Sequence, residues 1–368
     1  MNKSKTLLKT IHIDARMIYS SGIGRCLREI VKRLSYENLK IFLYCSYNDY
    51  NRFLNECNAD REKVIFKKNN SPIYSIREQL TGSIISIKTN NKDIFYFPHY
   101  NLPFIVPRNS VFTIHDFIQF KFPEYFNKNM VMLAKLILNN SVKKAKKIIV
   151  VSKSTASDFE SYFPEYKSKL KVVYNGVSEN FKVLDVEEKK KFKRQNHLDK
   201  YLLFVGNNKP HKNINALIDA FLMVKRRFSD LKLVLISQGL DLDAFNIKNK
   251  EDFIVINNIN DDLLVKYYNC ASIFVLPSFY EGFGLPVLEA MACGCPVIAS
   301  NVSSLPELCA GAAILVNPYD SVSIKKAIED IFSSNNLRNN LIKKGLERSK
   351  EFSWDKTSKK YLEVLNNL

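Results

Sequence analysis

Two acidic residues lie eight positions apart in the stretch SFYEGFGLPVLEAMACGCPVIAS, which spans residues 278–300. They are Glu281 and Glu289, and the residues around them are glycine, apolar or small. A carboxylate can accept hydrogen bonds from two hydroxyl groups, and the backbone N–H groups beside Gly282 and Gly284 can face an anion. The stretch therefore predicts a site for a ligand that carries both hydroxyl groups and phosphates.

Proline and glycine set the bounds of a helix inside this stretch. Pro286 suits the first helical position, Gly294 suits the residue past the end, and Pro296 prevents continuation. We therefore expect a helix over residues 286–293, with one acid in the loop before it and the other about one turn inside.

A second loop carries cations. In YLLFVGNNKPHKNINALIDAF, residues 201–221, Lys209 and Lys212 lie between a predicted strand and the N-terminus of a predicted helix. A cation at this position adds its charge to the helix dipole and can bind a diphosphate. The Walker pattern is absent, which disfavours an ATP-hydrolysing P-loop. An ordinary solvated lysine is the alternative interpretation.

Two of the five histidines follow predicted strands in the first half of the chain. His115 and Asp116 follow the strand at 111–114, and His99 lies in FPHYNLP just past another strand. Ligands of open parallel sheets bind outside the carboxyl ends of the strands, so these side chains indicate a polar site near a reacting centre. A single histidine would more often be structural.

A glycine pair follows the first predicted strand. In SSGIGRCLREIVKRL, residues 20–34, Gly22 and Gly24 permit a close backbone approach just before a helix. The dinucleotide fingerprint fails because Leu27 occupies its third glycine position and Cys45, not an acid, ends the second strand. We therefore expect a phosphate contact without NAD, with a purely structural turn as the alternative.

The composition is that of a two-domain globular protein. The chain has 368 residues, 46% of them hydrophobic, and seven scattered cysteines that form no CxxC pair, which indicates buried, reduced thiols. No signal peptide or membrane-spanning segment is evident, so we expect a cytoplasmic protein. The net charge of +18 is uneven: residues 1–178 hold 29 basic and 14 acidic residues, and the remainder holds 26 and 23.

Strand and helix patterns alternate along both halves, which predicts an α/β fold of two Rossmann-like, doubly wound domains facing across a cleft. We expect an N-terminal domain over 1–178, a C-terminal domain over 179–350 and a terminal helix over 351–368. The predicted strands span residues 10–13, 41–44, 94–97, 111–114, 148–151, 171–174, 201–205, 231–236, 253–256, 273–276, 296–299 and 313–316.

These motifs together resemble the retaining glycosyltransferases of family 4, which have the GT-B fold. IHIDAR, SSGIGR, FPHYNLP, TIHDF, VVYNGV, VGNNKPHKN and the EGFGLPVLEAMACGCPVIAS block occur in the family's order over nearly the whole chain. PHKN and PHYNLP are most similar to the bacterial branch that builds O-antigen or capsule chains, often from GDP-mannose. FSWDKTSKKYLEVL resembles the terminal helix that packs back on the N-terminal, acceptor-side domain.

The resemblance implies a role for each acid and for the loop between them. Glu281 meets the hydroxyl groups of the donor sugar, and Glu289 meets the ribose. The loop brings its backbone close to the diphosphate and the sugar through Gly282, Phe283, Gly284 and Leu285.

The same resemblance implies roles for the two other loops. Lys212 neutralises the diphosphate leaving group and His115 lines the sugar pocket, so both join Glu281 as candidate catalytic residues. We place His99 and Asp116 in the acceptor or sugar pocket, and Gly22 and Gly24 among the donor-binding residues.

The cation clamp departs from the family's pattern. Many members carry arginine where this chain has Asn207, so Lys212 is left with Lys209 or His211 as substitutes. We retain Asn207 and Lys209 as donor-binding candidates.

The expected reaction is transfer of a hexose, with mannose from GDP-mannose as the first choice, to a lipid-linked or growing oligosaccharide acceptor. No DxD pair at a strand end indicates a metal, so we expect a retaining, metal-independent transferase without a cofactor, whose donor is a substrate. The alternatives are a UDP-sugar-dependent transferase of the same fold, a degenerate transferase scaffold, and a basic nucleic-acid-binding protein. The last requires aromatic residues interleaved with lysine and arginine on one face, and KKAKK at 143–147 is too short to qualify.

The positive first half points to an anionic partner. We expect it to attach the protein peripherally to the inner face of a membrane, with a solvated face in a lysine-rich chain as the alternative. The candidate contacts are Arg25, Arg28, Lys32, Arg33, Lys67, Lys68, Lys143, Lys144, Lys146 and Lys147.

Overall fold

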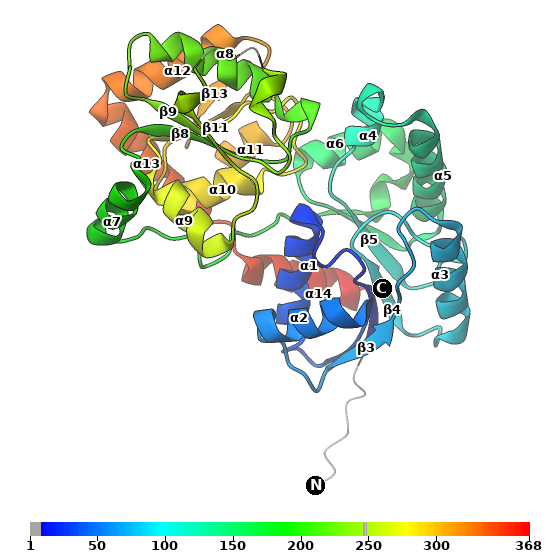
Figure 1. The fold of residues 1–368 in the computed structure, drawn as a ribbon. Coiled ribbons are helices and arrows are strands. Elements are labelled where there is room, and N and C mark those ends of the chain that lie inside the picture. The colour runs from blue at the N-terminus through cyan, green and yellow to red at the C-terminus, as the bar shows by residue number, and fades with distance from the viewer. Residues whose placement is uncertain (1–8, 246, 248) are drawn as a thin grey trace. The chain divides into compact units, whose positions relative to one another are not determined.

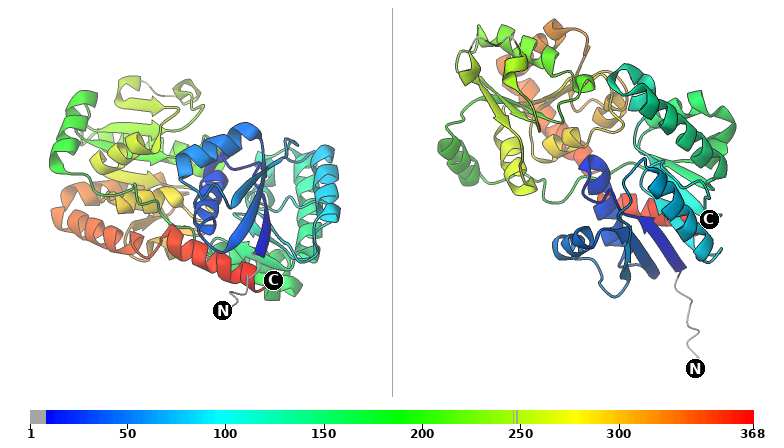
Figure 2. Two further views of the ribbon diagram at one scale, coloured as in Figure 1. Left: turned by 90° about the horizontal axis from the view of Figure 1, so that it is seen from below. Right: turned by 45° about the vertical axis from the view of Figure 1, so that its right-hand side comes forward.

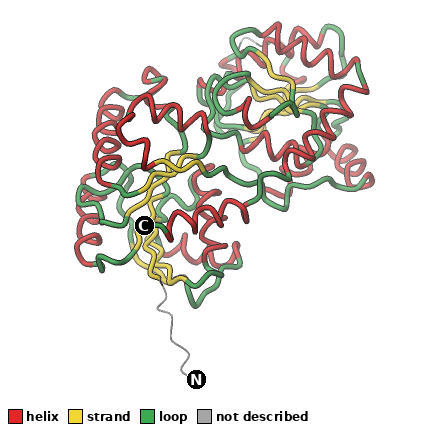
Figure 3. The backbone as a smooth tube through the Cα atoms, turned by 180° about the vertical axis from the view of Figure 1, so that it is seen from behind, coloured by secondary structure: helices red, strands yellow, loops and turns green. Residues whose placement is uncertain are grey.

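The chain forms two compact units. The computed structural model describes residues 9–245, 247 and 249–368. The first unit comprises the chain up to Gly176 together with Trp354–Leu368, and the second comprises Val177–Ser353. In each unit the strands lie at the centre and helices cover both faces of the sheet (Figure 3).

The first unit contains a seven-stranded sheet in which all paired strands are parallel, in the order β3-β2-β1-β4-β5-β6-β7. Its inner strands are rich in buried apolar residues because helices cover both faces of the sheet. They are β1 (Lys9–Asp14), β2 (Leu39–Cys45), β3 (Val64–Lys68), β4 (Ile94–Phe97), β5 (Ser110–Ile114), β6 (Lys147–Val150) and β7 (Leu170–Val172).

Helices connect these strands (Figure 1). They are α1 (Ser21–Leu34), α2 (Tyr47–Cys57), α3 (Ile76–Lys88), α4 (Ile118–Lys121), α5 (Lys128–Lys144) and α6 (Lys153–Tyr162), with short 3-10 helices η1 (Pro123–Tyr125) and η2 (Pro164–Lys169). Several begin at side-chain caps: Ser46, Ser75 and Ser152 each accept a hydrogen bond from a backbone N–H three residues later.

The second unit repeats the plan with six parallel strands in the order β10-β9-β8-β11-β12-β13. The strands are β8 (Tyr201–Val205), β9 (Lys232–Ile236), β10 (Phe253–Ile256), β11 (Ile273–Leu276), β12 (Val297–Ser300) and β13 (Ile314–Val316). The helices are α7 (Val186–Asn196), α8 (Ile214–Lys225), α9 (Asp261–Cys270), α10 (Leu285–Ala292), α11 (Leu305–Cys309), α12 (Ser321–Ser333) and α13 (Asn335–Ser349), with 3-10 helices η3 (Pro210–Lys212), η4 (Leu242–Ala244) and η5 (Lys250–Asp252).

Helix α14 (Trp354–Asn366) returns the chain to the first unit. The helix lies beside α1 and below the first sheet (Figure 2, left). Its Tyr361 hydroxyl lies 3.0 Å from the Thr113 hydroxyl of β5, and the Thr357 hydroxyl donates to the Tyr174 carbonyl at 2.8 Å. Trp354 and Tyr361 are almost fully buried, so α14 completes the core of the first unit.

The predicted doubly wound α/β class is confirmed, and each predicted strand coincides with an observed one within three residues at either end. The edge strand β3 was not predicted. Only its first residue, Val64, is buried and its last two are exposed, so its sequence VIFKK lacks a strong apolar signal. Helix α10 begins and ends one residue before the predicted bounds.

The expectation that Gly22 and Gly24 precede the first helix is wrong. Both lie in the first turn of α1, which begins at Ser21. A Cβ atom on Gly24 would lie 2.6 Å from the Ile18 carbonyl oxygen. The close approach of the loop before the helix therefore requires a residue without a side chain at this position. Nothing lies within 4 Å of a Cβ built on Gly22.

Candidate active site

The strand order reverses once in each sheet, and these reversals fix where a ligand can enter. In the second unit the reversal falls between β8 and β11, and in the first it falls between β1 and β4. In open parallel sheets the loops that leave the two neighbouring strands diverge at such a point, and ligands bind there at the carboxyl edge. The predicted site loops at 206–213 and 277–284 leave β8 and β11 at this point.

Lys212 and Glu281 form an ion pair between these two loops. The Lys212 Nζ lies 2.7 Å from the Glu281 Oε1, and the Ser278 hydroxyl donates to the same oxygen at 2.7 Å. The two charged side chains are only 13% and 10% exposed, so solvent screens the pair weakly. The structure thus brings together Lys212, which was expected to contact the diphosphate of the donor, and Glu281, which was expected to contact its sugar.

Asn213 joins the lysine loop to its neighbours. Its backbone is left-handed, with φ of 55°, and its side-chain amide donates to the Pro277 carbonyl at 3.0 Å and to the Pro318 carbonyl at 2.6 Å. The Phe279 N–H donates to the His211 carbonyl at 2.8 Å. These bonds hold Lys212 in place before any ligand binds.

Ser303 and Ser304 hold the glycine-rich loop at 281–284 through hydrogen bonds to its backbone. The Ser304 hydroxyl can donate to the carbonyl groups of Glu281 and Phe283, each at 2.9 Å, and the Glu281 N–H donates to the Ser303 hydroxyl at 3.0 Å. Neither serine was singled out from the sequence. They lie 22 and 23 residues from Glu281, and only the order of β11 and β12 in the sheet brings them close.

Gly284 sets the entry into α10. Its φ of +104° is unfavourable for a residue with a side chain, and a Cβ there would lie 2.7 Å from the Leu305 side chain. Leu285 then begins α10, so Gly282, Phe283 and Gly284 form the turn between Glu281 and the helix. A turn of this kind can point backbone N–H groups at an anion.

Glu289 lies about one turn into α10, as predicted, and is almost fully buried at 3% exposure. Its carboxylate accepts a hydrogen bond from the Tyr268 hydroxyl at 3.1 Å. Tyr268 packs edge-on against Phe181 and Phe274. The second acid is therefore part of a buried polar contact between α9 and α10.

The other candidates on the lysine loop are exposed or neutral. Asn207 and Lys209 are exposed, and the neighbouring Asn208 donates to the Gly239 carbonyl at 3.2 Å. Burial, with the nearby Lys212 charge, lowers the pKa of His211 to about 4. His211 is therefore neutral at pH 7 and adds no positive charge beside Lys212.

In the first unit, His99, His115 and Asp116 line one cavity of about 140 Å³ with Ile23, Tyr100 and Phe120 among its other walls. Their loops follow β4 and β5, and Ile23 comes from the first turn of α1. The structure brings these three predicted residues together at the carboxyl edge of the first sheet.

The chemistry of His115 follows from its surroundings. Its Nε2 lies 2.9 Å from the Pro98 carbonyl oxygen, which can only accept, so Nε2 carries the proton. Burial lowers the pKa of His115 to about 4 and, with the His115 charge, lowers that of His99 to about 3. Neutral His115 therefore has an unprotonated Nδ1, which can accept a hydrogen bond from a hydroxyl group.

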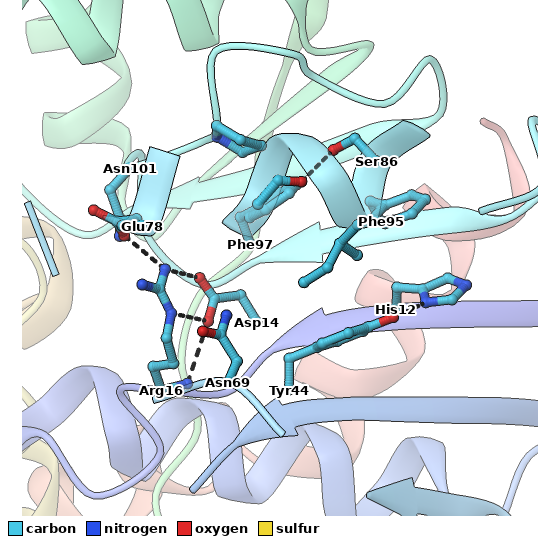
Figure 4. A pocket seen from close by; sticks show the side chains of 13 residues that line it. His12, Asp14, Arg16, Tyr44, Asn69, Glu78, Ser86, Phe95, Phe97 and Asn101 are labelled. Carbon is cyan, nitrogen blue, oxygen red and sulfur yellow. Dashed lines mark hydrogen bonds and ion pairs between the residues drawn. The ribbon is translucent and has the colours of Figure 1, made fainter. Parts of the chain in front are cut away.

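A second, smaller cavity of about 30 Å³ lies between β1, β4 and α3 of the first unit (Figure 4). Arg16 donates to both Asp14 oxygens, to Glu78 at 2.6 Å and to the Ser71 carbonyl at 3.1 Å. Asn101 also donates to Glu78. The carboxylates of Asp14 and Glu78 neutralise the Arg16 guanidinium. Arg16 therefore stabilises the fold here and is not available to bind a phosphate.

Two parallel-sheet units, with a partly buried lysine and glutamate at the switch point of one of them, define a Rossmann-like nucleotide-binding architecture. The chain matches two family models: Glycosyltransferase Family 4 over residues 20–181 and Glycosyl transferases group 1 over residues 185–348. The chain belongs to the family 4 glycosyltransferases.

Relatives with assigned activities support this membership. The chain is 29% identical over 359 residues to the O-antigen chain mannosyltransferase B of Escherichia coli, an alignment that covers 91% of this chain and 93% of that one. It is 29% identical over 254 residues to the O-antigen chain mannosyltransferase RfbU of Salmonella typhimurium, with 67% of each chain covered.

Solved structures share the fold. Anabaena HepE in complex with UDP and glucose has a TM-score of 0.78 at 18% identity, covering 98% of this chain and all of that one. WaaG, a glycosyltransferase involved in lipopolysaccharide biosynthesis, has a TM-score of 0.76 at 12% identity, covering 97% and 99%. The chain is a glycosyltransferase of GT-B fold.

Proposed function

We propose that this glycosyltransferase transfers mannose from GDP-mannose to a lipid-linked or growing surface-polysaccharide acceptor, with retention of the anomeric configuration and without a metal ion. The observation that carries the proposal is the Lys212–Glu281 pair at the switch point of the second sheet. The choice of mannose rests on the relatives that are O-antigen mannosyltransferases.

Donor binding would break the ion pair between Lys212 and Glu281 and give each side chain a new partner on the donor. The diphosphate takes over the Lys212 ammonium, and the Glu281 carboxylate accepts hydrogen bonds from sugar hydroxyls in its place. The N–H groups of the turn at 282–284 face the phosphate oxygens. Because Glu281 is already oriented by Ser278, little reorganisation is required when the sugar arrives.

The bond that breaks joins the anomeric carbon to the diphosphate oxygen, and the electron pair leaves with the nucleoside diphosphate. Lys212 and the oriented N–H groups stabilise the charge that develops on this oxygen, an effect worth several kcal/mol in a dry, preorganised site. The acceptor hydroxyl forms the new bond from the same face, and its proton passes to the departing phosphate. His115, which is neutral, positions a sugar hydroxyl and does not act as an acid.

Among the described residues, no helix is long and apolar enough to cross a bilayer. A lipid-linked acceptor would then have to be reached from the membrane surface. We propose a cytoplasmic enzyme that binds peripherally to an anionic leaflet, since the first half of the chain carries most of the positive charge.

The test is a donor screen followed by product analysis. Thermal melting is measured with UDP, GDP, ADP and their sugars, because a ligand of the native state raises the melting temperature. We expect GDP and GDP-mannose to stabilise the protein most and Lys212→Ala to remove that effect, while the exposed Lys191→Ala leaves it intact. NMR of the product then reports the anomeric configuration, and an inverted linkage would contradict retention.

A UDP-sugar donor is the second candidate, favoured by the fold shared with HepE bound to UDP-glucose. Stabilisation by UDP and not by GDP would replace the proposed donor. The absence of stabilisation by any nucleotide would contradict the nucleotide-sugar assignment itself.

A further inference from the structure

Helix α3 is apolar on its outer face, which reverses the usual arrangement of a surface helix. Ile76, Leu80, Ile84 and Ile87 are 51 to 81% exposed, and their spacing of four, four and three residues places them on one stripe. Glu78 and Gln79 are its buried residues. Surface helices of globular proteins normally turn apolar residues inward, so packing within the first unit does not explain this stripe.

Helix α5 carries a matching surface. Met132, Leu133 and Leu136 are exposed on one side, whereas Ile137 and Leu138 are buried on the other. Right-handed crossovers place α3 and α5 on the same face of the sheet, and Figure 1 shows them on one side of the first unit.

The loop at 103–105 links the two helices. The Ile105 N–H donates to the Ser83 hydroxyl of α3 at 3.3 Å, and Lys144 of α5 donates to the Phe104 carbonyl at 2.8 Å. Phe104 and Ile105 are themselves 57% and 49% exposed. The two helices and this loop therefore make one apolar surface, which we name the α3–α5 face.

The exposed charges on the segments that form this face have one sign. The segments 76–88, 103–109 and 128–144 contain a single acidic residue, Glu78, which is buried against Arg16. All their basic residues are exposed, namely Arg77, Lys88, Arg108, Lys128, Lys135, Lys143 and Lys144. A second copy of the chain would bring these charges against one another, whereas an anionic lipid surface is complementary to both the charges and the apolar side chains.

The face is also connected to the cavity of the first unit. The loop that carries His99 continues through Tyr100 to Phe104 within five residues, and the Ser141 hydroxyl of α5 donates to the Tyr100 carbonyl at 2.7 Å. Docking of this loop at a membrane would hold the cavity lined by His99 and His115 close to the headgroup layer, where a lipid-linked sugar lies.

We propose that the α3–α5 face inserts its apolar side chains into the headgroup region of an anionic membrane. The inference deepens the proposed function, on which the identity of the acceptor rests. It assigns to α3, α5 and their linking loop the membrane contact that the sequence placed on dispersed basic residues. Two of those residues, Arg28 and Arg33, are occupied by bonds to the Ile18 carbonyl and to Glu29 and Asp355.

The test measures sedimentation of the full chain with vesicles of phosphatidylcholine alone or mixed with phosphatidylglycerol. We expect binding to the mixed vesicles that weakens with salt and falls about ten-fold or more in Leu80→Ser/Ile84→Ser. The control, Val186→Ser/Val322→Ser, changes two similarly exposed residues of the second unit and should bind as the wild type does. Met132→Ser/Leu136→Ser repeats the test on α5 and keeps it decisive if the α3 variant does not fold.

Wild-type binding by both face variants, or no vesicle binding by the wild type, would overturn the proposal. A wild-type dimer that the face variants convert to a monomer, measured by sedimentation velocity without vesicles, would assign the face to a second copy instead. Transfer of the sugar to a water-soluble acceptor distinguishes a failure of the membrane-docking proposal from a failure of the proposed function. Folded face variants should retain it, whereas a wild type that docks on vesicles but transfers to no acceptor contradicts the proposed function alone.

Discussion

At the scale of single residues, the Glu281 carboxylate has a role that depends on its neighbours. Its Oε1 meets Lys212 and Ser278, so the negative charge is held close to a cation before a ligand binds. The motif identifies both residues, but the ion pair between them spans 69 positions and has no signal in the local sequence. Only the strand order, which places β8 beside β11, makes it predictable.

Replacing Glu281 should separate sugar recognition from nucleotide binding. We expect Glu281→Ala to reduce transfer about 100-fold or more, because a group aimed at the reacting sugar is lost. The GDP dissociation constant should change little or fall, since Lys212 is released for the diphosphate. Steady-state kinetics and calorimetric titration measure the two effects, with exposed Glu187→Ala as the control. Near-normal turnover in Glu281→Ala would show that the site is wrongly assigned.

The partly buried histidines of the first unit predict a loss of stability in acid. The pKa of His115 is lowered to about 4 in the native state, below its ordinary value of 6.5. Between these values the unfolded chain binds a proton that the native chain does not, so stability falls as the pH drops from 6.5 towards 4. One such group contributes a slope of up to about 1.4 kcal/mol per pH unit.

Urea unfolding between pH 4.5 and 7 measures this slope. We expect His115→Asn to reduce it, because the titrating group is gone. The exposed His197→Asn serves as the control, since asparagine tolerates the left-handed backbone of that position. An unchanged slope in His115→Asn would mean that another group governs the acid response.

At the scale of elements, the loop that enters α10 is set by backbone geometry. Gly284→Ala introduces a side chain at a φ of +104° and against Leu305, whereas Gly311→Ala has a φ of +82° with nothing within 4 Å. We expect both to destabilise the fold, by about 1 kcal/mol for the backbone alone and by about 1–3 kcal/mol more where the core is overpacked.

Only Gly284→Ala should also weaken nucleotide binding, because it displaces the N–H groups of the turn. Urea unfolding and GDP titration of the two variants provide the comparison. Equal losses of stability, or normal GDP affinity in Gly284→Ala, would contradict the role assigned to this turn.

The elements show what the sequence could and could not predict. Most of the strands are apolar runs that were visible in the sequence, whereas β3 was missed because this edge strand has a single buried residue and ends in two exposed lysines. The start of α1 was misplaced because glycine more often indicates a turn than a first helical turn. The polar inner face of α3 was not predicted either. Glu78 can be buried because it forms an ion pair with Arg16, which follows β1 and is distant in the sequence.

At the scale of the whole molecule, the charge distribution predicts how the diphosphate is neutralised. The chain carries a net +18, and Lys212 lies at the proposed leaving-group position. We therefore expect transfer to continue in excess EDTA, because the protein supplies the positive charge. Initial rates with and without the chelator test this expectation. Complete loss of activity that manganese or magnesium restores would replace the metal-free mechanism.

The return of α14 to the first unit has a consequence for how the polypeptide is made. A ribosome releases the strands of the first unit well before Trp354 and Tyr361, yet those two side chains fill its core. The second unit, Val177–Ser353, is continuous and has its whole core available earlier. During synthesis the unit that emerges first is therefore the last to be completed, and its unfinished face must be kept from aggregation until residues 354–366 leave the exit tunnel.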